Sequence, residues 1–331
     1  MSAAPLAAVV VPVYNAGPYL SACLRSLAAQ THPDWRCYLV DDGSDDGSGA
    51  LCDQAAREDA RFTALHQAQC GVSAARAAGV RAAKADGAAW IAFCDADDIC
   101  HPDLLRVLTG AAQAAAMPVA CCLYDSFTGE APHDAPACPA AARVLAAPRH
   151  LEALLHDHAV DFSLCNKLYR ADVLEPADFD NGFSFNEDLL TNWIVFSRLP
   201  GCAFVDFTGY HYRQHPGSAS HRPLAPESLD DQRRAAIYIR EHAAPDMQRS
   251  ADAFYYEKLV YLASMILRRE DADNYRVQLN ELGVGIRAGL NDPRLGRNPR
   301  LGLSIKVAAW ATVHCTRLWA AVCRRVLRDR Q

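Results

Sequence analysis

Three carboxylates follow an apolar run, since Asp95, Asp97 and Asp98 come directly after residues 90–94. The run predicts a strand buried on both faces, as in the centre of a parallel sheet. The carboxyl ends of such strands are where open α/β sheets bind ligands. Carboxylates this close repel one another without a counter-charge, and oxygen ligands suit Mg²⁺ or Mn²⁺. The pattern therefore favours a metal site over its alternative, a solvated acidic loop before the helix expected from Pro102.

Strands and helices alternate through the first third of the chain. Buried-strand patterns cover residues 6–12, 35–40, 61–66, 90–94 and 119–124, and helical spacing covers 19–30, 51–56, 71–84 and 102–116. This alternation predicts an α/β fold, with a Rossmann-like, mostly parallel sheet flanked by helices. No Gly-Lys dipeptide occurs, which excludes a Walker-type loop. No G-x-G-x-x-G follows the first strand, which speaks against a dinucleotide-binding domain.

The rest of the chain is less regular. Residues 129–142 are rich in Pro and Ala and predict a loop. Helices are expected over 150–156, from about 189 to 199, over 229–242 and over 254–269, and strands over 202–207 and 210–213. This pattern predicts a mainly helical C-terminal extension.

Composition narrows the class of protein. The 331 residues are 51% hydrophobic with a formal net charge of -6, which argues against a general nucleic-acid binder. The 13 cysteines form no C-x-x-C pair, and several lie in apolar strands, so a reducing cytoplasm is expected rather than a disulfide framework. The first 12 residues predict a strand rather than a signal peptide, and no apolar run is long enough to span a bilayer.

Basic charge is concentrated at the C-terminus. Residues 297–331 carry eight basic side chains and one acidic one. An apolar stripe with helical spacing comprises Val307, Trp310, Ala311, Cys315, Leu318, Trp319, Val322 and Val326, and Arg324, Arg325, Arg328 and Arg330 lie around its end. The stripe predicts a helix lying on an anionic membrane surface. The alternative is a terminal helix packed on the domain or in a homodimer.

Four short motifs carry a family resemblance. They are Val10–Asn15 (VVPVYN), Val40–Ser44 (VDDGS), Gly71–Arg76 (GVSAAR) and Asp95–Asp98 (DADD). In order and spacing they resemble the family-2 inverting glycosyltransferases, which have the GT-A fold. The resemblance is close over residues 6–110 and continues more thinly to about 220. It implies a glycosyltransferase domain at 1–220, with a nucleotide-sugar half at 1–125 and an acceptor half at 126–220. The helical extension is then 221–331, with a basic amphipathic tail at about 301–331.

The resemblance implies a nucleotide-sugar donor, most often a UDP-sugar, and a Mn²⁺ or Mg²⁺ ion. It assigns donor-binding roles to Pro12, Tyr14, Asn15, Asp42, Ser73, Arg76, Asp95, Ala96, Arg213 and His215. Asp42 matches the position that hydrogen-bonds the uracil, and Asp95 and Asp97 match the metal-site pair. The chain departs from the family where Cys70 replaces a common Gly and Ala77 replaces a common Asn.

Inversion at the anomeric carbon requires a base on the acceptor side. Glu187 and Asp188 resemble the family's acidic pair for this task, with Asp188 as the general base and Glu187 orienting the acceptor. The alternative is that both acids cap the following helix. The segment from His211 to Ser218 resembles the one that closes over the diphosphate, and Asn166-Lys167 falls where an acceptor floor is expected.

These observations predict a metal-assisted hexosyl- or N-acetylhexosaminyl-transferase of polysaccharide biosynthesis. Its acceptor would be a hydroxyl of a glycan or lipid-linked glycan, and its location the cytoplasmic face of the cell membrane. A sugar-nucleotide nucleotidyltransferase is a second reading, although residues 13–18 lack the basic loop it requires. A catalytically silent donor-binding protein is a third, against which the presence of Asp97 and Asp188 argues.

Overall fold

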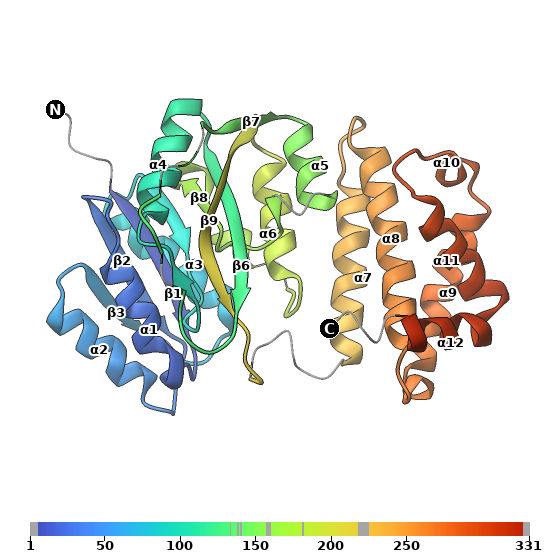
Figure 1. Cartoon of the computed structure of the whole chain (residues 1–331), viewed down its shortest axis with the longest axis horizontal. Coiled ribbons are helices and arrows are strands. Elements are labelled where there is room, and N and C mark those ends of the chain that lie inside the picture. Colours follow the sequence, from blue (N-terminus) through green and yellow to red (C-terminus); the bar gives the residue numbers. More distant parts are fainter. Residues whose placement is uncertain are drawn as a thin grey trace. The chain divides into compact units, whose positions relative to one another are not determined.

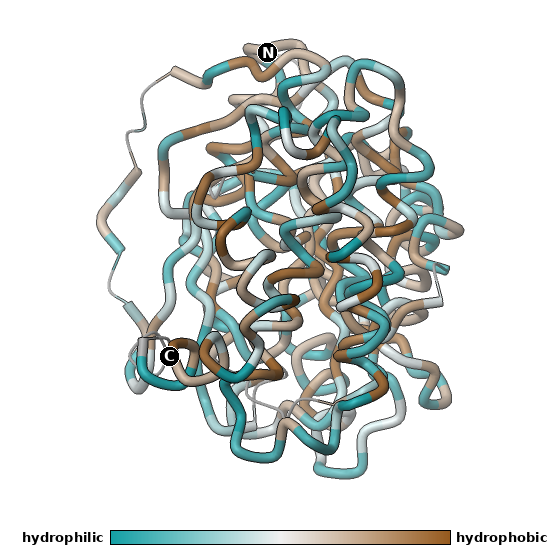
Figure 2. Tube along the Cα trace, turned by 90° about the vertical axis from the view of Figure 1, so that its right-hand side faces the viewer, coloured by the Kyte–Doolittle hydropathy of each residue, from teal (hydrophilic) through white to brown (hydrophobic). Residues whose placement is uncertain are grey.

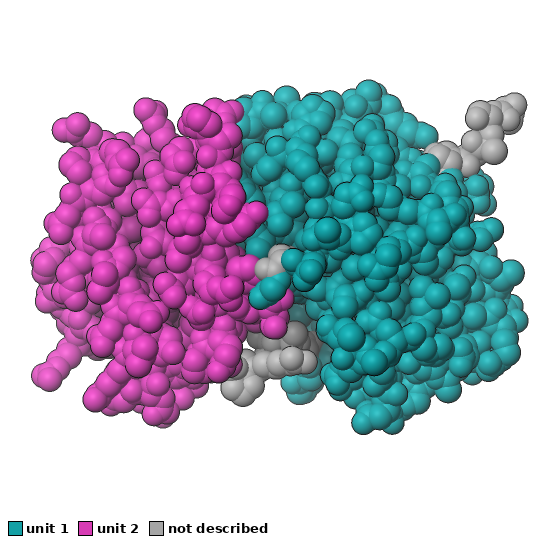
Figure 3. Space-filling model, turned by 180° about the vertical axis from the view of Figure 1, so that it is seen from behind, with its two compact units in different colours: residues 1–182, 187–222 teal, residues 183–186, 223–331 magenta. Residues whose placement is uncertain are grey.

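The computed structural model describes residues 6–132, 134–137, 139, 141–156, 160–180, 182–217 and 225–326. The chain divides into two compact units, drawn in different colours in Figure 3. Unit 1 comprises residues 1–182 and 187–222, and unit 2 comprises residues 183–186 and 223–331. Each unit is described by itself below.

Unit 1 is built on one sheet, in the order β3-β2-β1-β4-β8-β6-β9-β5, with β7 paired to β9 (Figure 1). The strands are β1 (Ala7–Val13), β2 (Trp35–Asp41), β3 (Phe62–His66), β4 (Trp90–Phe93), β5 (Ile99–Cys100), β6 (Val119–Phe127), β7 (Arg143–Ala146), β8 (Lys167–Arg170) and β9 (Gly201–Arg213). Strands β1 to β4 pair in parallel, as do β6 and β9, and β8 lies antiparallel between β4 and β6. The prediction of a mostly parallel α/β sheet is confirmed.

The helices of unit 1 alternate with these strands. They are α1 (Gly17–Ala28), α2 (Ser48–Glu58), α3 (Val72–Ala85), α4 (Leu104–Ala115), α5 (Arg149–His156) and α6 (Glu187–Phe196). Helix α3 packs on β1 and β2, where an added Cβ at Gly79 would lie 2.3 Å from Cγ1 of Val10. A side chain there would hold the helix away from the strand, so glycine permits the close packing.

Strand register places the predicted motifs at one edge of the sheet. Val13 at the end of β1 is opposite Asp41 at the end of β2, and Val10 in β1 is opposite Phe93, the last residue of β4. The turns after these three parallel strands therefore emerge together, and they carry the residues from Tyr14, Asp42 and Asp95 onward.

Sequence patterns missed part of this sheet. The expected strands 202–207 and 210–213 form one strand, β9, which stays in the sheet by bulging: between Phe204 and Tyr210 it contains extra residues opposite the Cys121–Tyr124 stretch of β6. Strands β5, β7 and β8 were not expected. They span two to four residues each, too few for a clear alternation, and β8 opens with Lys167, a residue type that is rarely buried.

Unit 2 is helical. It contains α7 (Pro226–Glu241), α8 (Gln248–Leu267), α9 (Arg276–Leu290), α10 (Pro293–Gly296), α11 (Leu303–His314) and α12 (Thr316–Val326). Helix α8 packs against α7, α9, α11 and α12, and supplies much of the buried apolar cluster. Brown and teal segments alternate along these helices in Figure 2, as expected for helices with one buried side. No helix in the described part of the chain is long and apolar enough to cross a membrane.

The prediction of one continuous helix through the tail is wrong. The chain leaves helical geometry at Cys315, with φ -134° and ψ 42°. The hydroxyls of Thr312 and Thr316 donate to the carbonyls four residues before them, a pattern that often bends helices. The predicted stripe is therefore divided, because Trp319 packs on the core and donates to Oγ of Ser264, whereas Trp310 is 53% exposed. Arg328 and Arg330 lie outside the described residues.

Candidate active site

The acidic turn after β4 is held by a buried carboxylate. Asp98 is fully buried, and its carboxylate accepts a hydrogen bond from the Tyr210 hydroxyl at 2.6 Å and from the Arg213 backbone N–H at 2.7 Å. Burial, together with the nearby charges of Asp95 and Asp97, raises the pKa of Asp98 to about 9. Both of its oxygens are engaged with β9, so Asp98 joins the end of β9 to the acidic turn.

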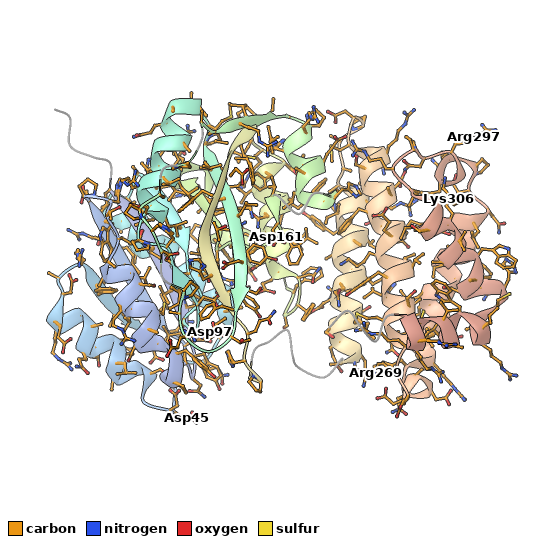
Figure 4. The ribbon with its side chains drawn as sticks, in the orientation of Figure 1. Asp45, Asp97, Asp161, Arg269, Arg297 and Lys306 are labelled. Atoms are coloured by element: carbon orange, nitrogen blue, oxygen red, sulfur yellow. The ribbon has the colours of Figure 1, made fainter. Side chains whose placement is uncertain are left out.

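This contact between Asp98 and β9 brings two basic side chains from the second half of the chain to the acidic turn after β4. Arg213 donates through Nε to the Asp97 carbonyl at 2.8 Å, and Nε2 of His215 lies 3.0 Å from Oδ2 of Asp97. The centroid of the Tyr19 ring lies 4.2 Å from the His215 ring centroid and 5.3 Å from the Arg213 guanidinium carbon. Asp97 and Asp45, labelled in Figure 4, both lie toward the lower end of the sheet in that view.

A second cluster is centred on Arg76, on the first turns of α3. Its guanidinium is buried and donates to Asp188 at 2.5 Å, to Glu187 at 3.2 Å and to Asp95 at 3.2 Å. Arg76 thus joins the acidic turn after β4 to the first turn of α6. Three carboxylates around one cation would be costly if the cation were absent. Within the described residues, Nε of Arg76 is buried without a hydrogen-bond partner.

The pKa of Asp188, the predicted general base, is raised. Burial raises its pKa to about 7, helped by the charges of Glu187 and Asp95 and opposed by Arg76 and by a hydrogen bond from the Leu164 backbone. A carboxylate with a pKa near neutrality can take up a proton during a reaction and release it afterwards. Both acids stand in the first turn of α6, where a helix favours negative charge, so the capping interpretation and the catalytic one are compatible here.

Asp42 lies in the turn that is predicted to bind the nucleotide, and its carboxylate already accepts three hydrogen bonds within the protein. Its Oδ1 accepts hydrogen bonds from Nε2 of Gln67 and the N–H of Cys70, and its Oδ2 accepts one from the N–H of Gly71, at 2.7–2.8 Å. The side chain is almost fully buried. In this structure Asp42 fixes the turn that leads into α3; its predicted hydrogen bond to uracil stays a prediction.

The turn after β1 is open to solvent and tied to the turn after β2. Tyr14 is 48% exposed, and Asn15 has a positive φ of 50°, which asparagine tolerates well. The Asn15 N–H donates to Oγ of Ser44, and its Oδ1 accepts from the N–H of Asp45. The exposed Tyr14 ring is therefore carried by a fixed turn. Of the other predicted donor-site residues, Pro12 and Ser73 are half-buried and Ala96 is buried.

The predicted metal pair can be tested against the chemistry of its donors. Among the described residues, no group of three His, Cys, Asp or Glu side chains is arranged to hold a metal ion. Asp97 and His215 nevertheless offer an oxygen and a nitrogen donor 3.0 Å apart. Burial and the charge of Asp95 raise the pKa of Asp97, against the effect of His215. A cation would relieve that unfavourable charge, so the two side chains fit Mn²⁺ or Mg²⁺ with further ligands supplied by substrate.

Two contributors to the site were not predicted. The Tyr210 hydroxyl binds Asp98 and joins the acidic turn to β9, and the Leu164 backbone opposes the rise in the pKa of Asp188. The acidic motif pointed to Asp98 but not to its partner, since a contact between distant segments leaves no local spacing in the sequence. A backbone donor such as the Leu164 N–H has no side-chain signature at all.

A mostly parallel sheet with an acidic turn at the carboxyl ends of its strands is the arrangement found in the GT-A class of glycosyltransferases, and this chain belongs to glycosyltransferase family 2. The family profile, described as "Glycosyl transferase family 2", matches residues 8–176. The protein is therefore a glycosyltransferase, of a family that uses nucleotide-sugar donors.

Particular relatives agree with this placement. The chain is 33% identical over 245 residues to the uncharacterized glycosyltransferase EpsJ of Bacillus subtilis, covering 72% of this chain and 70% of EpsJ. The crystal structure of S. aureus TarS residues 1–349 matches with a TM-score of 0.67 and 17% identity, covering 99% of this chain and 92% of that one. The same TarS fragment has been solved with UDP-GlcNAc. Mannosyltransferase PcManGT of Pyrobaculum calidifontis, solved with GDP-Man and Mn²⁺, matches at a TM-score of 0.50 and 16% identity, covering 99% of this chain and 88% of that one.

Proposed function

We propose that this enzyme transfers a hexosyl or N-acetylhexosaminyl group from a UDP-sugar to a hydroxyl of a glycan or lipid-linked glycan, with inversion. The observation that carries the proposal is the Arg76 cluster, which joins the Asp95 turn to an acid whose pKa is about 7. A UDP-sugar is supported by the match to TarS, which binds UDP-GlcNAc, over 97% of this chain.

In this mechanism Asp188 accepts the proton of the acceptor hydroxyl as the hydroxyl oxygen attacks the anomeric carbon. Glu187, which shares the Arg76 nitrogen with Asp188, orients the acceptor. Arg76 keeps both acids on the side of the sheet from which Asp95 emerges, so that donor and acceptor meet between them. Arg213 places a fixed positive charge beside the Asp97 turn, where the departing diphosphate would lie.

Asp97 and His215 would hold a Mn²⁺ or Mg²⁺ ion, with Asp95 beside it. When bound, the ion would bind the diphosphate oxygens and stabilise their charge as UDP leaves. Support comes from the donor pair itself and from the Mn²⁺ in the structure of PcManGT.

We also propose that the enzyme works at the cytoplasmic face of a membrane, where lipid-linked acceptors would be found. On α11, Leu303, Val307 and Trp310 are 77%, 53% and 53% exposed, and their spacing places them on one side of the helix. Exposed Arg317 and Arg325 lie on α12. Apolar and basic side chains exposed together fit an anionic lipid surface.

The direct test incubates the full chain with a panel of UDP-sugars, Mn²⁺ and octyl glycosides of common sugars, and measures UDP release and the glycoside product. Sugar transfer with an inverted anomeric configuration, read by NMR, supports the proposal. Pyrophosphate exchange into the UDP-sugar would instead identify a nucleotidyltransferase. Donor binding without turnover on any acceptor would identify a silent donor-binding protein.

A further inference from the structure

The loop from Val160 to Asn166, between α5 and β8, lies against the helix that carries the proposed base. The Phe162 carbonyl of this loop accepts a hydrogen bond from the amide nitrogen of Asn192, which lies four residues after Asp188 on α6. Four residues of an α-helix advance about 6 Å along its axis. The backbone of Phe162 is therefore held against α6 about one helical turn from Asp188.

This loop is fixed from inside by polar side chains. Lys167 is completely buried, and its ammonium group donates to the carbonyls of Asp161 and Ser163 and to Oδ1 of Asn166. The amide nitrogen of Asn192, on α6, donates to the Phe162 carbonyl at 2.7 Å. A buried ammonium group with three acceptors orders the backbone around it, because each carbonyl would otherwise be left unsatisfied. The outward side chains of the loop are thus presented by a rigid support.

Two exposed aromatic rings and one half-buried carboxylate belong to this loop and the strand beside it. Phe162 is 49% exposed and Tyr124, on β6, is 40% exposed. The Tyr124 hydroxyl donates to Oδ2 of Asp161 at 3.4 Å, so the ring and the carboxylate are neighbours. Asp161 is labelled in Figure 4. Oδ1 of Asp161 also accepts a hydrogen bond from the Ser163 backbone N–H at 2.8 Å. Each carboxylate oxygen has a second lone pair, so Asp161 can still accept a hydrogen bond from a ligand.

We propose that Tyr124, Asp161 and Phe162 form the acceptor-sugar subsite, which binds a pyranose ring. The C–H face of a pyranose packs on an aromatic ring, and its hydroxyls donate to a carboxylate. The inference rests on the proposed function and deepens it by naming the acceptor class. The hydroxyl attacked belongs to a sugar ring, not to a bare lipid or an amino-acid side chain. Phe162 and Asp161 determine acceptor affinity, whereas donor binding does not involve them.

The test measures acceptor binding directly, without turnover. Saturation-transfer NMR is recorded on the full chain with UDP, Mn²⁺ and the disaccharides maltose, lactose, cellobiose and chitobiose. We expect the ring C–H protons of at least one disaccharide to be saturated by the native enzyme. Phe162→Ala and Asp161→Asn should each weaken that binding at least about tenfold. The matched control is Tyr261→Ala, which removes a 55% exposed ring from α8 and should leave binding unchanged.

Two results would overturn the subsite. One is that none of the disaccharides binds the native enzyme, and the other is that Phe162→Ala binds as tightly as the native enzyme does. UDP release from UDP-sugars in the absence of acceptor is measured in parallel. If that slow hydrolysis proceeds while the subsite variants change nothing, the subsite is wrong and the proposed function stands. If no UDP-sugar is bound or hydrolysed, the proposed function fails independently of the subsite.

Discussion

Asp95 and Asp188 come from distant parts of the chain, yet both accept a hydrogen bond from the guanidinium of Arg76, at 3.2 and 2.5 Å. Asp95 follows β4, and Asp188 stands in the first turn of α6. One buried cation thus fixes the distance between the proposed donor side and the proposed base. Arginine suits this role because its planar fork can pair with two carboxylates at once, which a lysine ammonium does less specifically.

The first prediction concerns the proton acceptor. Asp188→Asn should lower kcat at least about 100-fold and leave UDP-sugar binding unchanged, because the amide cannot take the proton. In the native enzyme the base acts only when ionised, and its pKa is about 7. The rate should therefore rise with pH up to about 7 and level off above it, and the variant should lose this dependence. Glu187→Gln, the comparison variant, should keep a rate that rises with pH, but with its midpoint below 7, because the charge of Glu187 helps to raise the pKa of Asp188; an Asp188→Asn enzyme of near-native rate would make Asp188 structural.

The second prediction concerns stability. Arg76→Met leaves Asp95, Glu187 and Asp188 close together without their shared cation. We expect a loss of about 3 kcal/mol in the free energy of unfolding at pH 7.5, measured by urea denaturation. Arg36→Met is the control, since Arg36 pairs with Asp86 only at the surface, and it should cost less than about 1 kcal/mol.

The loss caused by Arg76→Met should depend on pH. A carboxyl whose pKa is raised by folding favours the native state most when it is protonated, and that contribution is lost as pH rises through the folded pKa. Burial already raises the pKa of Asp188 to about 7 beside Arg76, and removing the cation raises it further. The destabilisation should thus be smaller at pH 5 than at pH 7.5. Equal losses at both pH values would show that Arg76 acts through packing instead of charge.

Sequence reasoning located the motifs at the carboxyl ends of β1, β2 and β4 because each motif follows a strongly apolar strand. It could not predict that Lys167 lies buried in a strand, since the three oxygens that satisfy its ammonium group come from the loop before it. Nor could it foresee that Tyr210 bonds Asp98, a contact between distant segments. The apolar stripe of the tail correctly predicted helical residues, but the tail forms two helices and not one. Helix α11 ends at Cys315, after the Thr312 hydroxyl donates to the carbonyl four residues before it.

The third prediction concerns the metal. Asp97→Asn and His215→Ala should each raise the Mn²⁺ concentration that gives half-maximal activity at least about tenfold, because each removes one donor of the pair. A readout independent of turnover is the rise in Tm produced by UDP with Mn²⁺, which should shrink in both variants. Asp45→Asn, on the turn after β2, is the control and should change neither quantity. An unaltered Mn²⁺ requirement in Asp97→Asn would place the ion elsewhere.

The fourth prediction concerns the exposed side of α11. Deleting residues 301–331 would not test it, because Leu301 and Ala309 belong to the buried core of unit 2. Leu303→Ser with Trp310→Ser instead removes two exposed apolar side chains and should leave Tm nearly unchanged. We expect at least about tenfold weaker binding to vesicles of phosphatidylcholine with phosphatidylglycerol, measured by co-sedimentation, because each side chain contributes buried apolar area at the interface.

The matched control for the membrane prediction is Val277→Ser with Val284→Ser on α9, two side chains that are 66% and 67% exposed. These changes should leave vesicle binding as it is, since they remove exposed apolar area outside α11 and α12. Binding of the native enzyme should also weaken when salt is raised from 0.1 to about 0.5 M, because Arg317 and Arg325 would face anionic headgroups. If the α11 variant sediments with vesicles as the native enzyme does, its exposed side does not contact the lipid surface.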